Sequence, residues 1–416
     1  MRFSKHFPKT LKVPPADATA VNHQLLVRGG FMDQLMAGSW TLLPLGLRVV
    51  TKINNIIREE LNKTDAAEMA MPLLHPREIW DQTGRWSDPD VKEIMYQFKD
   101  IHDREFCLSF THEEIVMNLL GKTIESYKDL PVKVYQFSTK FRNELRAKSG
   151  IMRGREFLMK DLYSAHVSEE NMLEYYEKVK QAYVRIFERI GFKVMVAEAS
   201  GGVFTDKHTH EFQVENPAGE DIIYFCKECD FAQNKEVFEG QTGDKCQCGK
   251  GDIEEMKATE VGNIFPLGTR YSEKMKVFFK DENGENKPIW FASYGIGPTR
   301  VMGTLVEVFH DDRGIIWPEA VAPFQVHLIG LDLNDTEVKK QAEETYQTLL
   351  DKGVEVIYDD REDITAGAKF ADYDLIGIPY RLVISRKTGD KIEFKKRGDK
   401  DFIIMPLNEV MSNLSL

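Results

Sequence analysis

The sequence predicts an α+β fold: an antiparallel β-sheet flanked by helices, with a small cysteine-rich insert and a separate C-terminal α/β unit. Three observations lead to this fold class. Short runs between residues 106 and 166 alternate polar and apolar positions, as antiparallel strands do. Residues 49–61 and 168–190 carry apolar side chains at helical spacing. From about residue 323 the chain reads strand, helix, strand, which favours a parallel pair.

Composition and charge exclude several classes of protein. The chain has 416 residues, of which 42% are hydrophobic, and a net charge of -12. No apolar run approaches the roughly 18 residues of a membrane span, so we expect no membrane partner and a cytoplasmic location. Basic residues dominate the first 16 positions, but no amphipathic helix follows, which disfavours a transit peptide. Five cysteines are an odd number, which argues against a disulfide framework.

The first predicted elements are a helix and a short strand. Val49, Ile53, Ile57 and Leu61 fall on one helical face within residues 49–61. The run EMAMPLL that follows looks strand-like but contains Pro72. A proline in a strand belongs at an edge or a bulge. In a symmetric dimer, such an edge could lie at the subunit interface.

The runs EFCLSF, KVYQFSTKFRNE and GREFLMKDLYSAH are predicted strands, the last two being joined by a basic loop. A long helix over 168–190 follows, and PIWFASYGIGPTRVMGTLVEVF predicts a buried strand, a glycine turn and a helix. In the C-terminal unit, FQVHLIGL and VEVIYDD are predicted strands. The helix between them is expected to begin at a capping box of Asn334 and Glu337 and to end at Gly353.

Residues 142–161, RNELRAKSGIMRGREFLMKD, gather four arginines and two lysines in this acidic chain. Guanidinium groups match phosphate oxygens, and the ring of Phe157 can stack on a purine. Glu144, two residues after Arg142, is expected on the same strand face, where it can accept a hydrogen bond from an exocyclic amine. Downstream, SYGIGPTR places Arg300 after a glycine-rich turn. Any one of these arginines could simply be a solvated surface cation with a scattered ion pair. That explanation does not suit the whole spaced set, so the pattern predicts a purine nucleotide site.

These motifs resemble the class II aminoacyl-tRNA synthetases, and among them the prolyl-tRNA synthetases of the bacterial type. The helix before AEMAMPLLHP resembles motif 1, KFRNELRAKSGIMRGREFLMKD motif 2 and SYGIGPTR motif 3. Signatures specific to the amino acid also match, namely PADA, QTGRW, THEE, HEFQV, EVGNIFPLGTRYS and RGIIWP. The resemblance covers nearly the whole chain and implies activation of L-proline with ATP and Mg²⁺, transfer to tRNA(Pro), and a homodimer.

The resemblance also implies roles at matching positions. Arg142 and Arg300 would be catalytic, with Arg142 holding both the α-phosphate and the substrate carboxylate. The ATP site would comprise Arg142, Glu144, Arg153, Phe157, Glu260 and Arg300. The proline site would comprise Thr111, Glu113, Arg142, Met159, Asp161, Tyr163, Asn263 and Ser293. Taken alone, Thr111 and Glu113 would more simply be a helix N-cap and an acidic first turn.

Two features depart from that family. Asn263 stands where the bacterial type has histidine, in EVGNIF, and this change is expected to alter affinity. The interval between motifs 2 and 3 holds only a short cysteine insert in place of the family's large editing domain. We therefore expect no editing of alanyl-tRNA in cis, and a separate hydrolase in trans, because a proline pocket excludes the smaller alanine by only about 1 to 3 kcal/mol.

The insert contains four of the five cysteines, in the spacing C-x2-C-x16-C-x-C: Cys226, Cys229, Cys246 and Cys248. Four thiolates suit a structural Zn²⁺ site, which would close a loop too small to fold alone. The alternative is a set of unligated surface thiols, since the second pair is unusually close in sequence. The expected domains are residues 1–225 and 251–320 as two parts of the catalytic domain, 226–250 as the insert and 323–416 as the anticodon-binding domain.

The C-terminal unit resembles the anticodon-binding domain of class IIa synthetases. Arg361 and Lys369 are expected to contact the tRNA anticodon, although singly each could be a solvated cation. Other synthetases of this class are disfavoured by THEE followed by GREFLMKD. A catalytically dead paralogue that binds tRNA would tend to lose a motif 2 or motif 3 arginine, and here all of them are present. A free-standing amino-acid ligase is disfavoured by the C-terminal unit itself.

Overall fold

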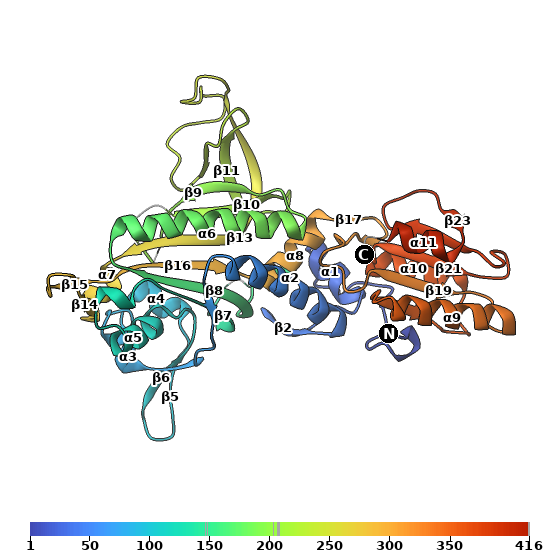
Figure 1. Ribbon diagram of the computed structural model, residues 1–416, viewed down its shortest axis with the longest axis horizontal. Helices are drawn as coiled ribbons and strands as arrows, with labels where there is room; N and C mark the ends of the chain where they lie inside the picture. Colours follow the sequence, from blue (N-terminus) through green and yellow to red (C-terminus); the bar gives the residue numbers. More distant parts are fainter. Residues whose placement is uncertain (146, 148, 203, 206–208, 415–416) are drawn as a thin grey trace. The chain divides into compact units, whose positions relative to one another are not determined.

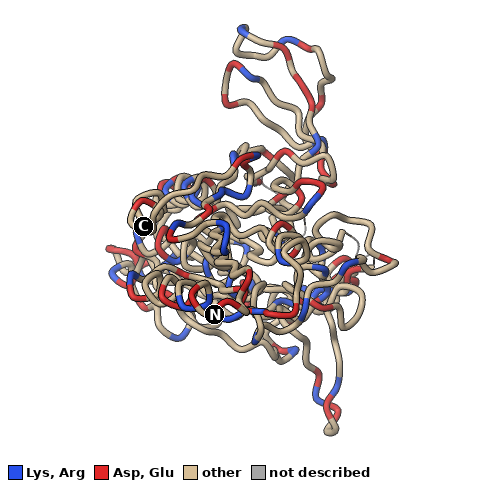
Figure 2. The backbone as a smooth tube through the Cα atoms, turned by 90° about the vertical axis from the view of Figure 1, so that its right-hand side faces the viewer, with Lys and Arg blue, Asp and Glu red and all other residues tan. Residues whose placement is uncertain are grey.

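The computed structural model describes residues 1–145, 147, 149–202, 204–205 and 209–414. The chain forms two compact units. One comprises Met1–Leu35, Thr41–Ile53 and Leu305–Leu416, and the other comprises Met36–Trp40 and Asn54–Thr304. The first unit thus combines N-terminal segments with the C-terminal part of the chain. The functional domain bounds given above stay a prediction. In both units, acidic and basic residues are interspersed along the chain (Figure 2).

A nine-stranded sheet organises the larger unit. Its strand order is β10-β9-β12-β11-β13-β16-β8-β7-β3, and β10 also pairs with β13. The strands are β3 (Ala67–Glu68), β7 (Val132–Phe141), β8 (Glu156–His166), β9 (Met195–Ala199), β10 (Thr209–Glu215), β11 (Asp221–Cys226), β12 (Ala232–Asn234), β13 (Ile253–Gly268) and β16 (Trp290–Ile296). The central pairs β7–β8, β8–β16 and β16–β13 are antiparallel, which confirms the predicted sheet.

Helix α6 (Glu169–Ile190) covers β8, β13 and β16 (Figure 1). Ser168 caps it by accepting a hydrogen bond from the N–H of Asn171, and Gly191 ends it in the left-handed conformation. The buried face carries Met172, Val179 and Ile186, as the periodicity predicts. Burial of this stripe fixes the helix on the sheet and leaves the opposite sheet face free to form a site.

The remaining elements of this unit surround the sheet. They are α3 (Arg77–Asp81), α4 (Pro89–Ile94), α5 (Glu113–Thr123) and α7 (Arg270–Lys274), with a small sheet β4-β6-β5 (Leu74–Pro76, Glu105–Leu108, Gln97–Lys99) and the hairpin β14–β15 (Phe278–Lys280, Asn286–Pro288). Each of the helices α2 (Pro44–Asn62) and α8 (Pro298–Val308) has its residues divided between the two units. The hairpin β1–β2 (Met32–Met36, Ser39–Leu42) precedes α2.

The C-terminal part of the smaller unit is the predicted α/β unit. Its sheet has the order β20-β19-β21-β22-β23, with β19 (Val326–Gly330) parallel to β20 (Val356–Asp359) and β21 (Tyr380–Ile384). The antiparallel strands β22 (Ile392–Lys396) and β23 (Ile403–Met405) complete it. Helices α9 (Thr336–Asp351), α10 (Ala366–Ile376) and α11 (Leu407–Asn413) accompany the sheet, and α1 (Val21–Arg28) and the pair β17–β18 (His310–Asp311, Gly314–Ile315) belong to the same unit.

Three local predictions are wrong. Pro72 lies in a segment without strand structure between β3 and β4, because the carbonyl and N–H groups there bond to side chains instead of a ladder. Arg142 and Glu144 lie beyond the end of β7, where the N–H of Glu144 donates to the carbonyl of Arg142. Helix α9 is capped by Asp335 and not by Asn334, since the Asp335 carboxylate accepts from two first-turn N–H groups.

Candidate active site

A cavity of about 410 Å³ lies in the larger unit. It is lined by every residue predicted for the ATP and proline sites: Thr111, Glu113, Arg142, Glu144, Arg153, Phe157, Met159, Asp161, Tyr163, Glu260, Asn263, Ser293 and Arg300. These residues span almost two hundred positions in the sequence. The fold therefore brings together the side chains that motif analysis had grouped, while their individual roles stay predictions.

Strand register explains why they meet. Glu211 of β10 pairs with Asn263 of β13, which pairs with Gly295 of β16, which pairs with Asp161 of β8. Paired residues share a sheet face, so one row of side chains crosses four strands. Gly295 contributes no side chain, and a Cβ there would only reach ordinary contact with neighbours 3.9 Å away. At Gly295, in the middle of the row, the cavity therefore reaches down to the backbone of the sheet.

Alternate residues of β8 face the cavity, as the period of a strand requires. Phe157, Met159, Asp161 and Tyr163 all line it. The aromatic ring lies at the end of the strand near the basic loop, and the polar pair lies deeper, where Asp161 is 4% exposed and Tyr163 is 1% exposed. A ligand lying along β8 would therefore meet a flat apolar ring first and a small polar recess last.

Two guanidinium groups face this cavity with unused donors. The Arg142 guanidinium lies over the Phe157 ring, 5.3 Å from its centroid, and an Arg300 nitrogen lies 3.4 Å from a Glu260 oxygen. The Nε atoms of both arginines are buried and, among the described residues, have no hydrogen-bond partner. Burial lowers the pKa of Arg142, although Glu260 and Glu144 oppose that shift. A buried cation with a spare donor is costly unless an anion meets it, so these atoms favour an oxyanion ligand.

The basic loop lies beside these arginines. Arg153 is exposed and pairs with Glu220, with 3.0 Å between nitrogen and oxygen, and its Nε lies 3.6 Å from a Glu144 oxygen. Glu144, predicted to meet the adenine edge, is thus already beside a cation. Such exposed pairs are weak, so both side chains remain available to a ligand.

At the other end of the cavity, Thr111 donates its hydroxyl hydrogen to Glu113, with distances of 2.6 and 2.8 Å to the two carboxylate oxygens. Glu113 lies in the first turn of α5, as expected, but the N-cap position is His112 and not Thr111. Burial raises the pKa of Glu113, and Arg85 opposes the shift from 3.3 Å. The pair offers closely spaced acceptors to a ligand with two N–H donors.

Arg85 is a neighbour that motif analysis did not assign, although it lies in the quoted QTGRW. It is 4% exposed, and its Nη1 reaches Glu113, Glu114 and the Tyr271 hydroxyl. Two adjacent buried carboxylates require a cation nearby. The sequence does contain a sign of this cation, because THEE places both glutamates in one helical turn, where they need a positive charge if they are buried.

A buried polar network supports the floor below Asp161. Lys140 donates to Asp161 at 2.9 Å and to His112 Nδ1 at 2.8 Å, and Gln136 and Tyr163 also donate to the Asp161 carboxylate, at 3.0 and 2.9 Å. Burial alone would raise the pKa of Asp161, but Lys140 and its other donors outweigh burial and hold it below the usual value. The carboxylate is therefore held as an anion by three side-chain donors.

Two family profiles match the chain: one described as tRNA synthetase class II core domain (G, H, P, S and T), over residues 96–309, and one described as anticodon binding domain, over residues 321–415. The proline--tRNA ligase of Persephonella marina is 34% identical, and the alignment covers 99% of each chain. That of Wolbachia pipientis wMel is 38% identical, with 100% of each chain covered. The chain belongs to the prolyl-tRNA synthetase family.

As a member of the proline--tRNA ligases, it shares its fold with solved synthetases. The Cryptosporidium parvum prolyl-tRNA synthetase complexed with halofuginone and AMPPNP has a TM-score of 0.79 at 20% identity, covering 94% of this chain and 75% of that one. The Giardia lamblia prolyl-tRNA synthetase in complex with prolyl-adenylate has a TM-score of 0.78 at 19% identity, covering 93% and 74%. These likenesses show the common fold.

The alignments of this synthetase with the two relatives differ in length. The alignment with the Persephonella ligase spans 560 positions, although this chain has 416 residues, so at least 144 of those positions hold none of its residues. The alignment with the Wolbachia ligase spans only 428 positions. Both short and long forms therefore exist among the ligases that this chain matches.

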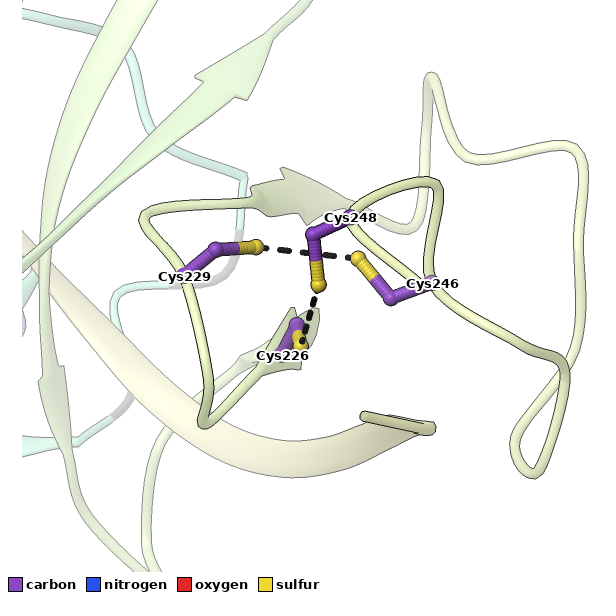
Figure 3. A group of neighbouring side chains, drawn as sticks. All are labelled: Cys226, Cys229, Cys246 and Cys248. Carbon is purple, nitrogen blue, oxygen red and sulfur yellow. Dashed lines mark hydrogen bonds between the residues drawn. The ribbon is translucent and has the colours of Figure 1, made fainter. Parts of the chain in front are cut away.

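The four cysteines of the insert converge, with their sulfur atoms pointing toward one another (Figure 3). All four Sγ atoms lie within 4.8 Å of one another, with Cys229 and Cys246 at 3.6 Å and Cys226 and Cys248 at 3.8 Å. A tetrahedral zinc with bonds of about 2.3 Å places its sulfur ligands about 3.8 Å apart. The group could hold a metal ion, and its spacing fits zinc.

The C-terminal cations lie in a different setting from the one expected. Arg361 pairs with Asp359 at 2.6 Å and with Asp372 at 2.8 Å. Lys369 is 2% exposed, and its ammonium donates to the carbonyl of Gly330 at 2.7 Å. The structure thus presents no accessible ammonium at Lys369, and an anticodon contact by either residue stays a prediction. Among the helices of the described residues, none is long and apolar enough to cross a membrane.

Proposed function

We propose that this synthetase activates L-proline with ATP to prolyl-adenylate and pyrophosphate, and then transfers the prolyl group to the 3′ end of tRNA(Pro). One observation carries the proposal. A single cavity holds an aromatic ring and two arginines at one end, and a threonine–glutamate acceptor pair at the other; the buried Nε donors of both arginines have no partner in the part of the chain that the structure describes. The first set suits a purine nucleotide, and the second suits a secondary ammonium group.

In this proposal the nucleotide lies over Phe157, with the carboxylate of Glu144 at the adenine amine. Arg142, which already lies over the ring, binds the α-phosphate and the proline carboxylate together. Arg153 and Arg300 reach the outer phosphates, and Glu260 orients Arg300 from 3.4 Å. Catalysis then consists of positioning and charge stabilisation, because the proline carboxylate attacks the α-phosphorus directly and pyrophosphate leaves.

The proline ring would occupy the recess above Gly295. Its two N–H donors meet Thr111 and Glu113, while Met159, Asp161, Tyr163, Asn263 and Ser293 form the walls. Burial raises the pKa of Glu113, and the Arg85 guanidinium and the Thr111 hydroxyl oppose that shift; an incoming secondary ammonium would further favour the carboxylate. Mg²⁺ bound with ATP would neutralise phosphate charge, and Glu260 offers the hard carboxylate oxygen that such an ion prefers.

We further propose that this synthetase does not edit alanyl-tRNA(Pro) in cis. The chain between β8 and β16 holds strands β9–β13 of the nine-stranded sheet and the cysteine insert, and the 560-position alignment with the Persephonella ligase includes at least 144 positions that hold no residue of this chain. Discrimination against alanine by binding alone is worth about 1 to 3 kcal/mol. A separate hydrolase acting in trans would therefore be needed.

The four-cysteine group is proposed to bind a structural Zn²⁺, which would cross-link two loops and leave no open position for catalysis. Binding of the tRNA anticodon by the C-terminal unit, homodimer formation and a cytoplasmic location are proposals that follow from membership of the family. Catalytic and anticodon-binding domains with the bounds predicted above belong to the same proposal.

The test is proline-dependent ATP–pyrophosphate exchange by the wild type, Arg142→Ala and Arg104→Ala. Arg104 is an exposed arginine, paired with Asp100, that does not line the cavity. We expect exchange with proline, weaker exchange with alanine, and a loss of at least about 100-fold in Arg142→Ala alone. Absence of exchange with any amino acid, from folded wild-type protein, would refute the enzyme function and favour a tRNA-binding paralogue.

A further inference from the structure

The hairpin β11–β12 joins the four-cysteine group to the wall of the cavity. Cys226 is the last residue of β11, and its N–H donates to the carbonyl of Phe231 at 3.0 Å. Cys226 and Cys229 therefore lie in the turn of this hairpin. On the returning strand, Asn234 pairs with Ile223. In Figure 1, β11 leads into the loops that extend from the sheet beyond β9 and β10.

Asn234 reaches a residue of the cavity. Its Nδ2 donates to Glu211 at 3.0 Å, and Asn234 itself is only 6% exposed. Glu211 lines the cavity but has no role in the functions assigned above. Its carboxylate also accepts hydrogen bonds from Gln213 at 2.8 Å and from Asn263 at 3.3 Å. The insert, through Asn234, and Gln213 of β10 thus hold one oxygen of this carboxylate, while the proline-site residue Asn263 donates to the other.

This carboxylate needs to be held. Burial, followed by the neighbouring charge of Glu260, raises the pKa of Glu211 to about 7, whereas its amide donors oppose the rise. Two carboxylates facing one cavity repel each other, and an amide donor orients one of them without adding charge. Loss of the Asn234 donor would leave the Glu211 side chain to rotate away from Asn263 or to take up a proton. Either change alters the wall next to the proline recess.

Backbone pairing joins Asn234 firmly to the hairpin but joins the hairpin to β9 at only one position. Strand β12 has three residues, all of which pair with β11, whereas its pairing with β9 consists of the single match Gln233–Glu198. Short strands at the end of a hairpin open readily, because few ladder hydrogen bonds must break. Cys246 and Cys248 come from a separate loop, so a metal bound by all four sulfurs would tie that loop to the hairpin turn.

We propose that Asn234 is a positioning residue that orients Glu211 beside the proline recess, and that metal bound at the four cysteines sustains this arrangement by ordering the hairpin. The insert is then a support of the amino-acid site. The kinetic readout of this inference rests on the proposed function, and its metal rests on the proposed four-cysteine site. The metal itself takes no part in the reaction.

The kinetic experiment compares Asn234→Ala, Cys229→Ser and their double variant with the wild type. Gln233→Ala is the matched control, because Gln233 makes the same type of bond, from its amide to Glu198 at 2.9 Å, but neither residue lines the cavity. Zinc content is measured for each protein, and kcat and KM for proline and for ATP come from pyrophosphate exchange. Asn234→Gln tests rescue by a longer amide.

We expect Asn234→Ala to retain zinc and to lose about 10-fold in kcat/KM for proline, the order expected for one hydrogen bond to a charged group. The KM for ATP should change less. Cys229→Ser should lose zinc and show the same defect, and the double variant should be no worse than Cys229→Ser, because both changes remove one interaction. Gln233→Ala should stay within about 2-fold of wild type. An Asn234→Ala variant with wild-type kcat/KM, or fully additive defects in the double variant, would overturn the proposal.

Hydrogen exchange supplies a readout that needs no activity. Chelation of zinc from the wild type should lower the protection of amides in β12 and in β10 around Glu211, and leave β8 unchanged. Unchanged protection of β10 after removal of the metal would refute the coupling, even if the wild type catalysed no exchange with proline. A wild type without exchange but with the expected loss of protection would refute the proposed function alone.

Discussion

Replacement of Lys140 by methionine is the sharpest test of how the floor of the cavity is built. Lys140 is fully buried, and its ammonium donates to Asp161 at 2.9 Å, to Ser138 at 2.5 Å and to His112 at 2.8 Å. Methionine has nearly the same length and no charge. The substitution therefore leaves the packing largely intact and leaves the Asp161 carboxylate without its cation.

The magnitude follows from the burial of both partners. Removal of one member of a buried ion pair costs about 3 to 5 kcal/mol, because the remaining charge stays desolvated. Gln136 and Tyr163 still donate to Asp161, so we expect the lower end of this range. Lys133→Met is the control on the same strand. Its ammonium lies 3.9 Å from an exposed Asp65 oxygen and 4.8 Å from the centroid of the Tyr175 ring, and each of these contacts is worth about 1 kcal/mol or less.

The dependence on pH has a definite sign. In the wild type, the pKa of Asp161 is below its unfolded value, so its contribution to stability is present above that value and is lost as the pH falls. In Lys140→Met, the folded pKa rises above the unfolded value because burial now dominates. The destabilisation should therefore be largest near pH 8 and smaller at pH 5, where Asp161 takes up a proton.

The free energy of unfolding would be measured by guanidinium denaturation, followed by tryptophan fluorescence, at both pH values. Lys140→Met combined with Asp161→Asn should recover most of the loss, because the unpaired charge is removed. A loss below about 1 kcal/mol at pH 8, or a loss that grows toward pH 5, would refute this account of the floor.

Three further predictions concern other parts of the chain. Burial lowers the pKa of His112 to about 3 and that of His75 to about 4. Folding is therefore favoured by these two neutral side chains above pH 6.5, and each loses about 1.4 kcal/mol of that stability per pH unit as the pH falls toward 4. His112→Asn should flatten the fall of the melting temperature between pH 7 and pH 5, and an unchanged slope would exclude His112 as a cause. Glu113→Gln should raise KM for proline at least about 10-fold with little change in KM for ATP, measured by pyrophosphate exchange; equal effects on both substrates would argue against a contact with the imino group. Asp335→Ala should lower the free energy of unfolding of the C-terminal unit by about 1 kcal/mol, measured by chemical denaturation, because it removes the N-cap of α9; a neutral effect would contradict that cap.

Local patterns were sufficient for most elements, and the family resemblance supplied most of the expected site residues. The periodicity of residues 168–190 predicted α6 within one residue, and the alternation in GREFLMKDLYSAH predicted β8, whereas its cavity-lining residues Met159, Asp161 and Tyr163 were expected from the family resemblance. These features depend on side chains a few positions apart, which a sequence displays directly. Where a side chain competes with the backbone for hydrogen bonds, as at Pro72 and Asp335, the local pattern was insufficient.

The sequence by itself determined which chemical groups are present: the arginines, the aromatic ring, the acidic pair and the four thiols. Only the tertiary structure decided their partners. Lys140 meets Asp161 and Asn234 meets Glu211 because particular strands pair in a particular register, and Lys369 is buried because α10 packs on its sheet. Strand pairing is a long-range choice, made by the packing of the whole core, and no short stretch of sequence encodes it.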